Sequence, residues 1–108
     1  MLIGVGRIVL DFYNNTDGPK KRRQLEELCG DLRKKFNISA LEVADFEDPE
    51  RCVIGFAAVI PESWKYPSAK SLVEKICETL DKTAFARVMV EDTDLLVHGE
   101  EGAAGDEN

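Results

Sequence analysis

Two stretches of the sequence place apolar residues at helical spacing, and their position between strand-like segments limits the fold more than any other feature. In residues 19–36 the apolar positions recur after three, four, seven and eleven residues, at Leu25, Leu28, Cys29, Leu32 and Phe36. In residues 68–82 they recur in the same way, at Ala69, Leu72, Val73, Ile76, Cys77 and Leu80. This spacing is typical of a helix that buries one side. We therefore expect two amphipathic helices that each cover an apolar surface.

The segments around these helices have the composition of strands: residues 2–13, 38–46, 52–60 and 84–90, the last with an extension toward residue 97. In the first segment the side chains alternate, and one set carries Arg7 and Asp11. We expect that set to be the more exposed, because alternate side chains of a strand point to opposite faces. The third segment is almost entirely apolar, which is typical of a central strand.

The resulting order is strand, helix, strand, strand, helix, strand. This order is the signature of the α+β ferredoxin-like sandwich, in which two helices cover one face of a four-stranded antiparallel sheet. The other face of the sheet is then expected to be open. A length of 108 residues fits one domain, which we place at residues 1–98.

Charge is distributed unevenly along the chain, whose formal net charge is -7. Four of the 21 acidic residues lie in residues 99–108, which hold no Lys or Arg, and we predict a disordered acidic tail there. Residues 20–35 have the opposite bias, with seven basic and three acidic residues. The pattern predicts a mildly acidic domain with one basic helix, unlike a uniformly basic nucleic-acid binder.

The cysteines favour a reduced, cytoplasmic protein without a structural metal. Their number is odd and their spacing fits no zinc motif: they are Cys29, Cys52 and Cys77. Each lies in an apolar pattern, so we expect buried thiols. We also expect no membrane helix, because no apolar run approaches the ~18 residues that such a helix needs. A signal peptide is not expected, because no basic region precedes the first apolar stretch and Gly4, Gly6 and Arg7 interrupt it. No cofactor is expected either, since Gly4-Val5-Gly6 lacks the third glycine and the following helix of a dinucleotide-binding motif.

Several residues resemble the YlxP-like family of small bacterial proteins of unknown function. The resemblance is carried by Lys21-Arg22-Arg23, by the junction Phe36-Asn37-Ile38-Ser39 with Glu42-Val43 after it, and by the apolar segment that follows Arg51. It spans residues 2–96 and implies a ferredoxin-like fold. Family genes often lie beside genes for translation initiation and ribosome maturation, which implies RNA or a ribosome-associated protein as partner. The chain departs from the family pattern at Asp17-Gly18-Pro19 and in a longer loop at residues 61–67.

The basic helix is the leading candidate for a binding site. Four of its residues are expected to contact phosphate groups or a protein partner: Lys21, Arg22, Arg23 and Arg33. The alternative is a solvated helix face on which the arginines pair with Glu26 and Glu27.

The open sheet face is the second candidate, as an interface between copies of the chain. Val53, Ala57 and Val59 predict an apolar stripe on it. Base stacking there is disfavoured, because Phe56 is the one aromatic residue of its segment. Trp64, in the longer loop, is expected either to pack on the core or to anchor a partner.

An enzymatic function is not expected. An acylphosphatase-like site needs an Arg in the first loop, and residues 14–19 contain none. The acidic residues at 42–50 lack the glycine and spacing of a calcium loop, so they favour a solvated hairpin. His98 has no partner nearby in the sequence that indicates a ligand or a base.

Overall fold

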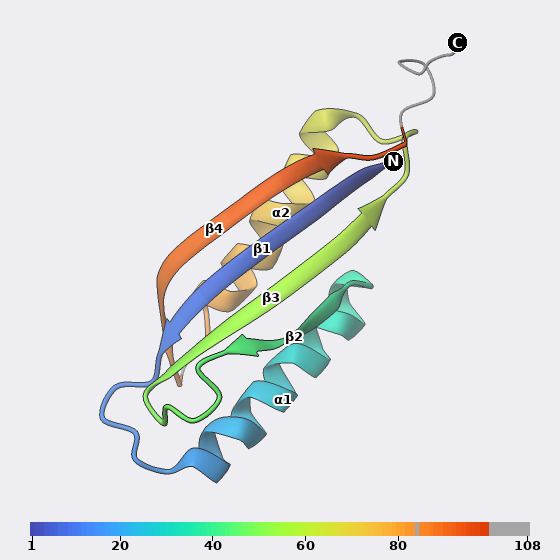
Figure 1. Ribbon diagram of the computed structural model, residues 1–108. Coiled ribbons are helices and arrows are strands. Elements are labelled where there is room, and N and C mark those ends of the chain that lie inside the picture. The colour runs from blue at the N-terminus through green and yellow to red at the C-terminus, as the bar shows by residue number, and fades with distance from the viewer. Residues whose placement is uncertain (84, 100–108) are drawn as a thin grey trace.

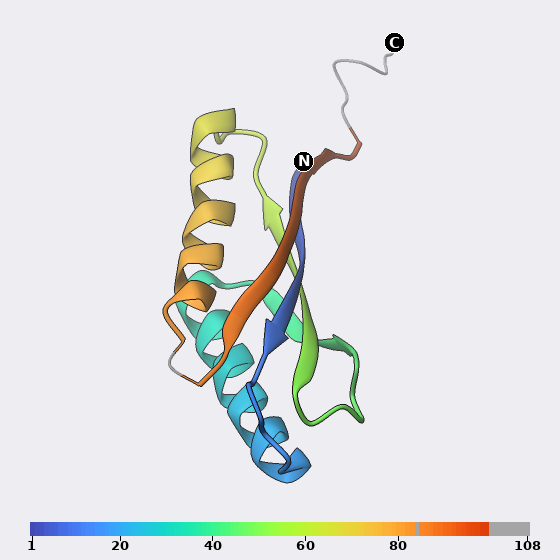
Figure 2. The same ribbon diagram turned by 90° about the vertical axis from the view of Figure 1, so that its left-hand side faces the viewer.

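The computed structural model describes residues 1–83 and 85–99. Its elements follow the predicted order: β1 (Leu2–Asp11), α1 (Gly18–Phe36), β2 (Ser39–Ala44), β3 (Arg51–Ile60), α2 (Tyr66–Asp81) and β4 (Arg87–Val97). Two helices lie on one face of a four-stranded sheet, and no element covers the other face within the described residues (Figures 1 and 2). The predicted α+β ferredoxin-like fold is therefore confirmed. The predicted acidic tail, apart from Gly99, lies outside the described residues.

The sheet has the strand order β2-β3-β1-β4, and every neighbouring pair is antiparallel. Ile8 of β1 lies opposite Ile54 of β3 on one side and Glu91 of β4 on the other. The nearly continuous apolar segment forms β3, a central strand as its composition predicts. The edges are β2, which lies beside α1, and the long strand β4 (Figure 1).

The core lies between the helices and the sheet. Helix α1 packs on β2, and α2 packs on β1 and β4. Both predicted helical stripes point inward, and so do Ile8, Leu10 and Phe12 of the first segment. A Cβ atom at Gly4 would lie 3.0 Å from a methyl of Val73, so this glycine lets α2 approach the sheet closely.

Both ends of α1 lie at residues whose type favours a helix end, whereas the start of α2 does not. The Asp17 carboxylate accepts a hydrogen bond from the Lys20 amide at 3.0 Å, and Asn37 ends α1 in the left-handed region at φ 52°. Helix α2 begins at Tyr66, two residues before the segment 68–82 whose spacing predicts a helix, so Ser68 lies inside the helix and does not cap it. Pro67 fits the first turn because the amide it lacks has no partner within a helix there.

Candidate partner-binding surfaces

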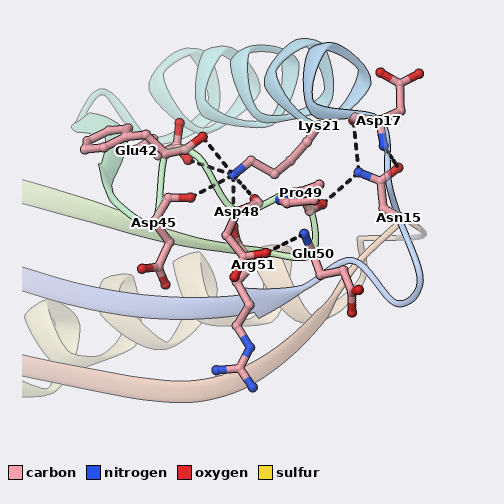
Figure 3. A network of polar contacts seen from close by, with 10 residues as sticks. Asn15, Asp17, Lys21, Glu42, Asp45, Asp48, Pro49, Glu50 and Arg51 are labelled. Atoms are coloured by element: carbon pink, nitrogen blue, oxygen red, sulfur yellow. Dashed lines mark hydrogen bonds and ion pairs between the residues drawn. The ribbon is translucent and has the colours of Figure 1, made fainter.

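Lys21 points into the molecule and is 1% exposed. Its ammonium group donates hydrogen bonds to four main-chain carbonyl oxygens of the β2–β3 loop and the start of β3 (Figure 3): Asp45 at 2.9 Å, Phe46 at 3.4 Å, Asp48, and Arg51 at 2.9 Å. Carbonyl groups turned away from water need donors, and because a lysine ammonium has three N–H donors, one of them is shared between two of these oxygens. Lys21 therefore closes this loop from inside and does not belong to the exposed binding surface expected of it.

Glu42 supplies the negative charge that faces this ammonium. Its Oε2 atom lies 3.4 Å from the Lys21 nitrogen, and its side chain is 16% exposed. Among the described residues, this oxygen accepts no hydrogen bond. The expectation of a fully solvated hairpin is wrong for Glu42, because alternation in β2 turns its side chain toward α1 together with Ala40 and Ala44.

The loop before α1 is tied to the same hairpin. The Asn15 amide nitrogen donates to the carbonyl oxygens of Pro49 at 2.7 Å and Asp17 at 3.0 Å (Figure 3). The Phe12 amide donates to the Glu50 carbonyl at 2.7 Å. These contacts, together with Lys21, fix the first turns of α1 on the β2–β3 loop. The exposed residues that follow along α1 therefore extend from a helix whose first turns are held in place by this loop.

Arg22, Arg23 and Arg33 are all exposed on α1. Within the described residues, none of these guanidinium groups lies within ion-pair distance of a carboxylate, including those of Glu26 and Glu27. The structure therefore shows an exposed helix face, as the alternative expected, but without the expected pairing to Glu26 and Glu27. Arg33 also has an internal contact, because its Nη1 donates to the Ala40 carbonyl at 2.6 Å.

The three arginines do not all point the same way. Arg22 and Arg33 line a shallow hollow between α1 and β2, beside Leu41. Arg23 lies one residue further round the helix, and Lys34 follows it after three turns on the side away from the core. We call the exposed basic residues of this helix the α1 basic surface: Lys20, Arg22, Arg23, Arg33, Lys34 and Lys35.

Acidic residues gather on the opposite side of the helical layer. The hollow between α2 and β4 is lined by four carboxylates: Glu74, Glu78, Asp81 and Glu91. A protein with a net charge of -7 keeps a basic region at α1 because residues 20–35 hold seven basic and three acidic residues, although Glu26 and Glu42 line the hollow beside Arg22 and Arg33. The net charge alone does not describe the field that a partner meets at α1.

The open sheet face carries exposed apolar side chains. Val59 is 73% exposed, and the neighbouring exposed residues of this face are Leu41, Val43, Ala57, Val90 and Leu96. Val53 was expected among them but is 2% exposed. Phe56 is buried on the helix side, which leaves no aromatic residue of β3 on the open face.

Trp64 lies at the helical layer and not on the sheet face. It belongs to the β3–α2 loop, is 43% exposed, and lines a groove together with Phe36 of α1 and Leu72 of α2. Trp64 is therefore an exposed side chain at this groove, and its role as a partner anchor stays a prediction.

The cysteine thiols are not suited to chemistry. Cys29 and Cys52 are buried and Cys77 is partly buried, and all three are free. Burial raises the pKa of Cys52 to about 12 and that of Cys77 to about 11, and it also raises the pKa of Cys29. A thiol is a nucleophile only as thiolate, so these groups are poor nucleophiles near neutral pH. The described residues contain no cluster of three metal-ligating side chains and no helix able to span a membrane.

Comparison with known proteins identifies the family. The model of a family described as protein of unknown function (DUF503) matches residues 3–93, from β1 into β4. The chain belongs to the DUF503 family. No curated protein matches it. The YlxP-like resemblance stays a prediction, and the description of the DUF503 family assigns no activity.

Proposed function

We propose that this DUF503 protein is a non-enzymatic accessory protein that binds RNA through the α1 basic surface. The observation that carries the proposal is the exposure of Arg22, Arg23 and Arg33 without a carboxylate partner among the described residues. Guanidinium groups that are not neutralised within the protein are free to contact phosphates and displace their counterions. A ribosome-associated protein with an acidic surface is the alternative partner for the same residues.

Two features support an accessory role rather than catalysis. The loop before α1, the place where a sandwich of this kind would hold an anion, carries Asp17 and no Arg. The raised pKa values of Cys52 and Cys77 keep their thiols protonated.

The proposal is tested by measuring RNA affinity as a function of salt, with Arg22→Ala/Arg23→Ala against a matched control. The control, Arg7→Ala/Lys70→Ala, removes the same charge from exposed positions on β1 and α2. Each lost phosphate contact lowers the salt slope by about one, so the α1 variant is expected to lose about two units of slope and about tenfold in affinity at low salt. The control is expected to bind as the unchanged protein does.

Equal losses in both variants would show only a response to net charge and would contradict the proposal. Binding that is independent of salt would do the same. Affinity capture with and without ribonuclease separates the two partner classes. Loss of the captured material after ribonuclease supports RNA, whereas retention of a protein partner that the α1 variant fails to capture favours the ribosome-associated protein.

A second function, self-association through the open sheet face, is favoured by the exposure of its apolar side chains. Val59, at 73%, is the most exposed of them, and Leu41, Val90 and Leu96 extend the same face. Exposed apolar patches of this kind are often protein–protein interfaces. Static light scattering is expected to show a dimer, and Val59→Asp is expected to give a monomer. Thr16→Asp, which adds the same charge on an exposed loop, is the matched control. A monomer at high concentration for the unchanged protein would exclude this function.

A further inference from the structure

A groove of about 780 Å³ opens between the C-terminal end of α1 and the first turns of α2. Figure 1 shows the two helices that border it. Its lining is contributed by α1, by the β3–α2 loop and by α2: Phe36, Ser63, Trp64, Lys65, Pro67, Ser68, Ser71, Leu72 and Lys75. The groove is separate from the hollow that Arg22 and Arg33 line on the other flank of α1.

The lining combines two kinds of group. Trp64, at 43% exposure, and the partly buried Phe36 supply aromatic surface. Lys65 and Lys75 supply positive charge, and the lining described contains three serine hydroxyls and no carboxylate. Aromatic rings together with lysine and hydroxyl donors are the groups that bind single-stranded nucleic acid, because bases stack on the rings and phosphates accept from the donors.

The groove is also joined to the α1 basic surface. Phe36 and Lys75 line a second hollow next to it, together with Lys35, Glu78, Thr79 and Lys82. The Lys35 ammonium lies 5.3 Å from the centre of the Phe36 ring. Lysines therefore continue from the last turn of α1 across to the groove, with one carboxylate, Glu78, among them. The other carboxylates of the hollow between α2 and β4, which are Glu74, Asp81 and Glu91, line neither the groove nor this second hollow.

We propose that this groove holds an unpaired segment of RNA, with one base stacked on Trp64 and the adjoining phosphates at Lys65 and Lys75. The inference rests on the proposed function and specifies the ligand as single-stranded RNA. Stacking and lysine contacts discriminate little among bases, so the site is expected to tolerate different sequences. The lining carries two lysines and no carboxylate, so its charge is complementary to that of a polyanion such as RNA.

Trp64 is the only tryptophan of the chain, so its fluorescence reports on the groove directly. A uridine oligonucleotide of about eight nucleotides, a length within the usual range of single-strand sites, is the probe. Saturable quenching of Trp64 at low salt is expected. Lys65→Ala/Lys75→Ala is expected to weaken the binding about tenfold, and Trp64→Phe, measured by anisotropy of a labelled oligonucleotide, by a smaller factor.

The control Arg7→Ala/Lys70→Ala again matches the charge change and is expected to leave the quenching curve unchanged. Trp64→Phe keeps an aromatic ring in the loop, and circular dichroism melting confirms that each variant is folded. Oligonucleotide binding that is lost in Arg22→Ala/Arg23→Ala but leaves Trp64 fluorescence and the Lys65/Lys75 variant unaffected would overturn the groove site and leave the proposed function intact. Absence of any oligonucleotide binding would overturn both. Quenching by an acidic peptide but not by the oligonucleotide would assign the groove to a protein partner and overturn the inference.

Discussion

Lys21 and Arg22–Arg23 are consecutive basic residues on one turn of α1, yet they occupy opposite environments. Lys21 is 1% exposed, and its ammonium contacts only protein groups, whereas the two arginines are exposed. The difference comes from position on the helix. Lys21 continues the inward stripe of Leu25, Leu28 and Leu32, and the next two residues turn away from it. Charge alone therefore does not predict which basic residue is free to bind a partner.

Lys21 and the two arginines also differ in how much they contribute to the stability of the fold. Removing an ammonium group from water costs several kcal/mol, which only close oxygen partners offset. Four carbonyl oxygens and the Glu42 carboxylate surround Lys21. An exposed arginine is not desolvated, and surface charges contribute about 0–1 kcal/mol to stability. We therefore assign Lys21 to the stability of the fold, and the arginines to contacts outside it.

The largest expected effect in this comparison is that of Lys21→Met. The substitution keeps the apolar stem but leaves the loop carbonyls without their donor and Glu42 without its counter-charge, so the free energy of unfolding is expected to fall by about 3 kcal/mol. Urea denaturation followed by circular dichroism measures it. Lys20→Met, one residue earlier and exposed, is the control and is expected to change stability by less than about 0.5 kcal/mol. Equal effects at the two positions would remove the distinction between interior and surface cations.

Glu42→Gln is expected to have the next largest effect, a loss of about 1–2 kcal/mol, because the ammonium loses its counter-charge but keeps its carbonyl partners. The ion pair is 3.4 Å long and Glu42 is 16% exposed, so water screens part of it. A double-mutant cycle with Lys21→Met isolates the pair. Additive losses would mean that Glu42 acts on stability independently of Lys21.

The order of elements and the inner face of each helix were predictable, because periodicity depends on local sequence. Residue type also indicated a cap at Asp17 or Gly18 and a left-handed stop at Asn37, and the structure has Asp17 as the cap. The start of α2 could not be predicted from residue type. Ser68 is a good cap by type, but Pro67 before it is already helical. The YlxP-like resemblance agreed with the fold but did not indicate which basic residues are exposed.

The inward orientation of Lys21 had a signal that the prediction overlooked. Lys21 precedes Leu25 by four residues and Leu28 by seven, which places it on the apolar stripe. The parity of Glu42 with Ala40 and Ala44 was a second signal. The identity of the carbonyl partners was not predictable, because the hydrogen bonds of the Lys21 ammonium join residues 24 to 30 positions apart and exist only once the hairpin has packed.

Arg33→Ala tests the intermediate case, a surface residue with one internal contact. Its Nη1 donates to the Ala40 carbonyl at 2.6 Å across the α1–β2 junction. Because the site is exposed, the loss is expected to be about 1 kcal/mol, below that of the buried lysine. Thermal melting measures the change, and Arg33→Lys is expected to recover part of it. A melting curve identical to that of the unchanged protein would place Arg33 with Arg22 and Arg23.

Arg22→Ala/Arg23→Ala is expected to have the smallest effect on stability, within about 0.5 kcal/mol. Glu26 and Glu27 follow at helical spacing, but neither lies within ion-pair distance of these arginines. Alanine also has a higher helix propensity than arginine, which offsets any weak attraction that is lost. Urea denaturation at low and high salt measures the change. A loss near that of Lys21→Met would show that the arginines support the fold, and the binding defect of the same variant would then no longer identify a contact surface.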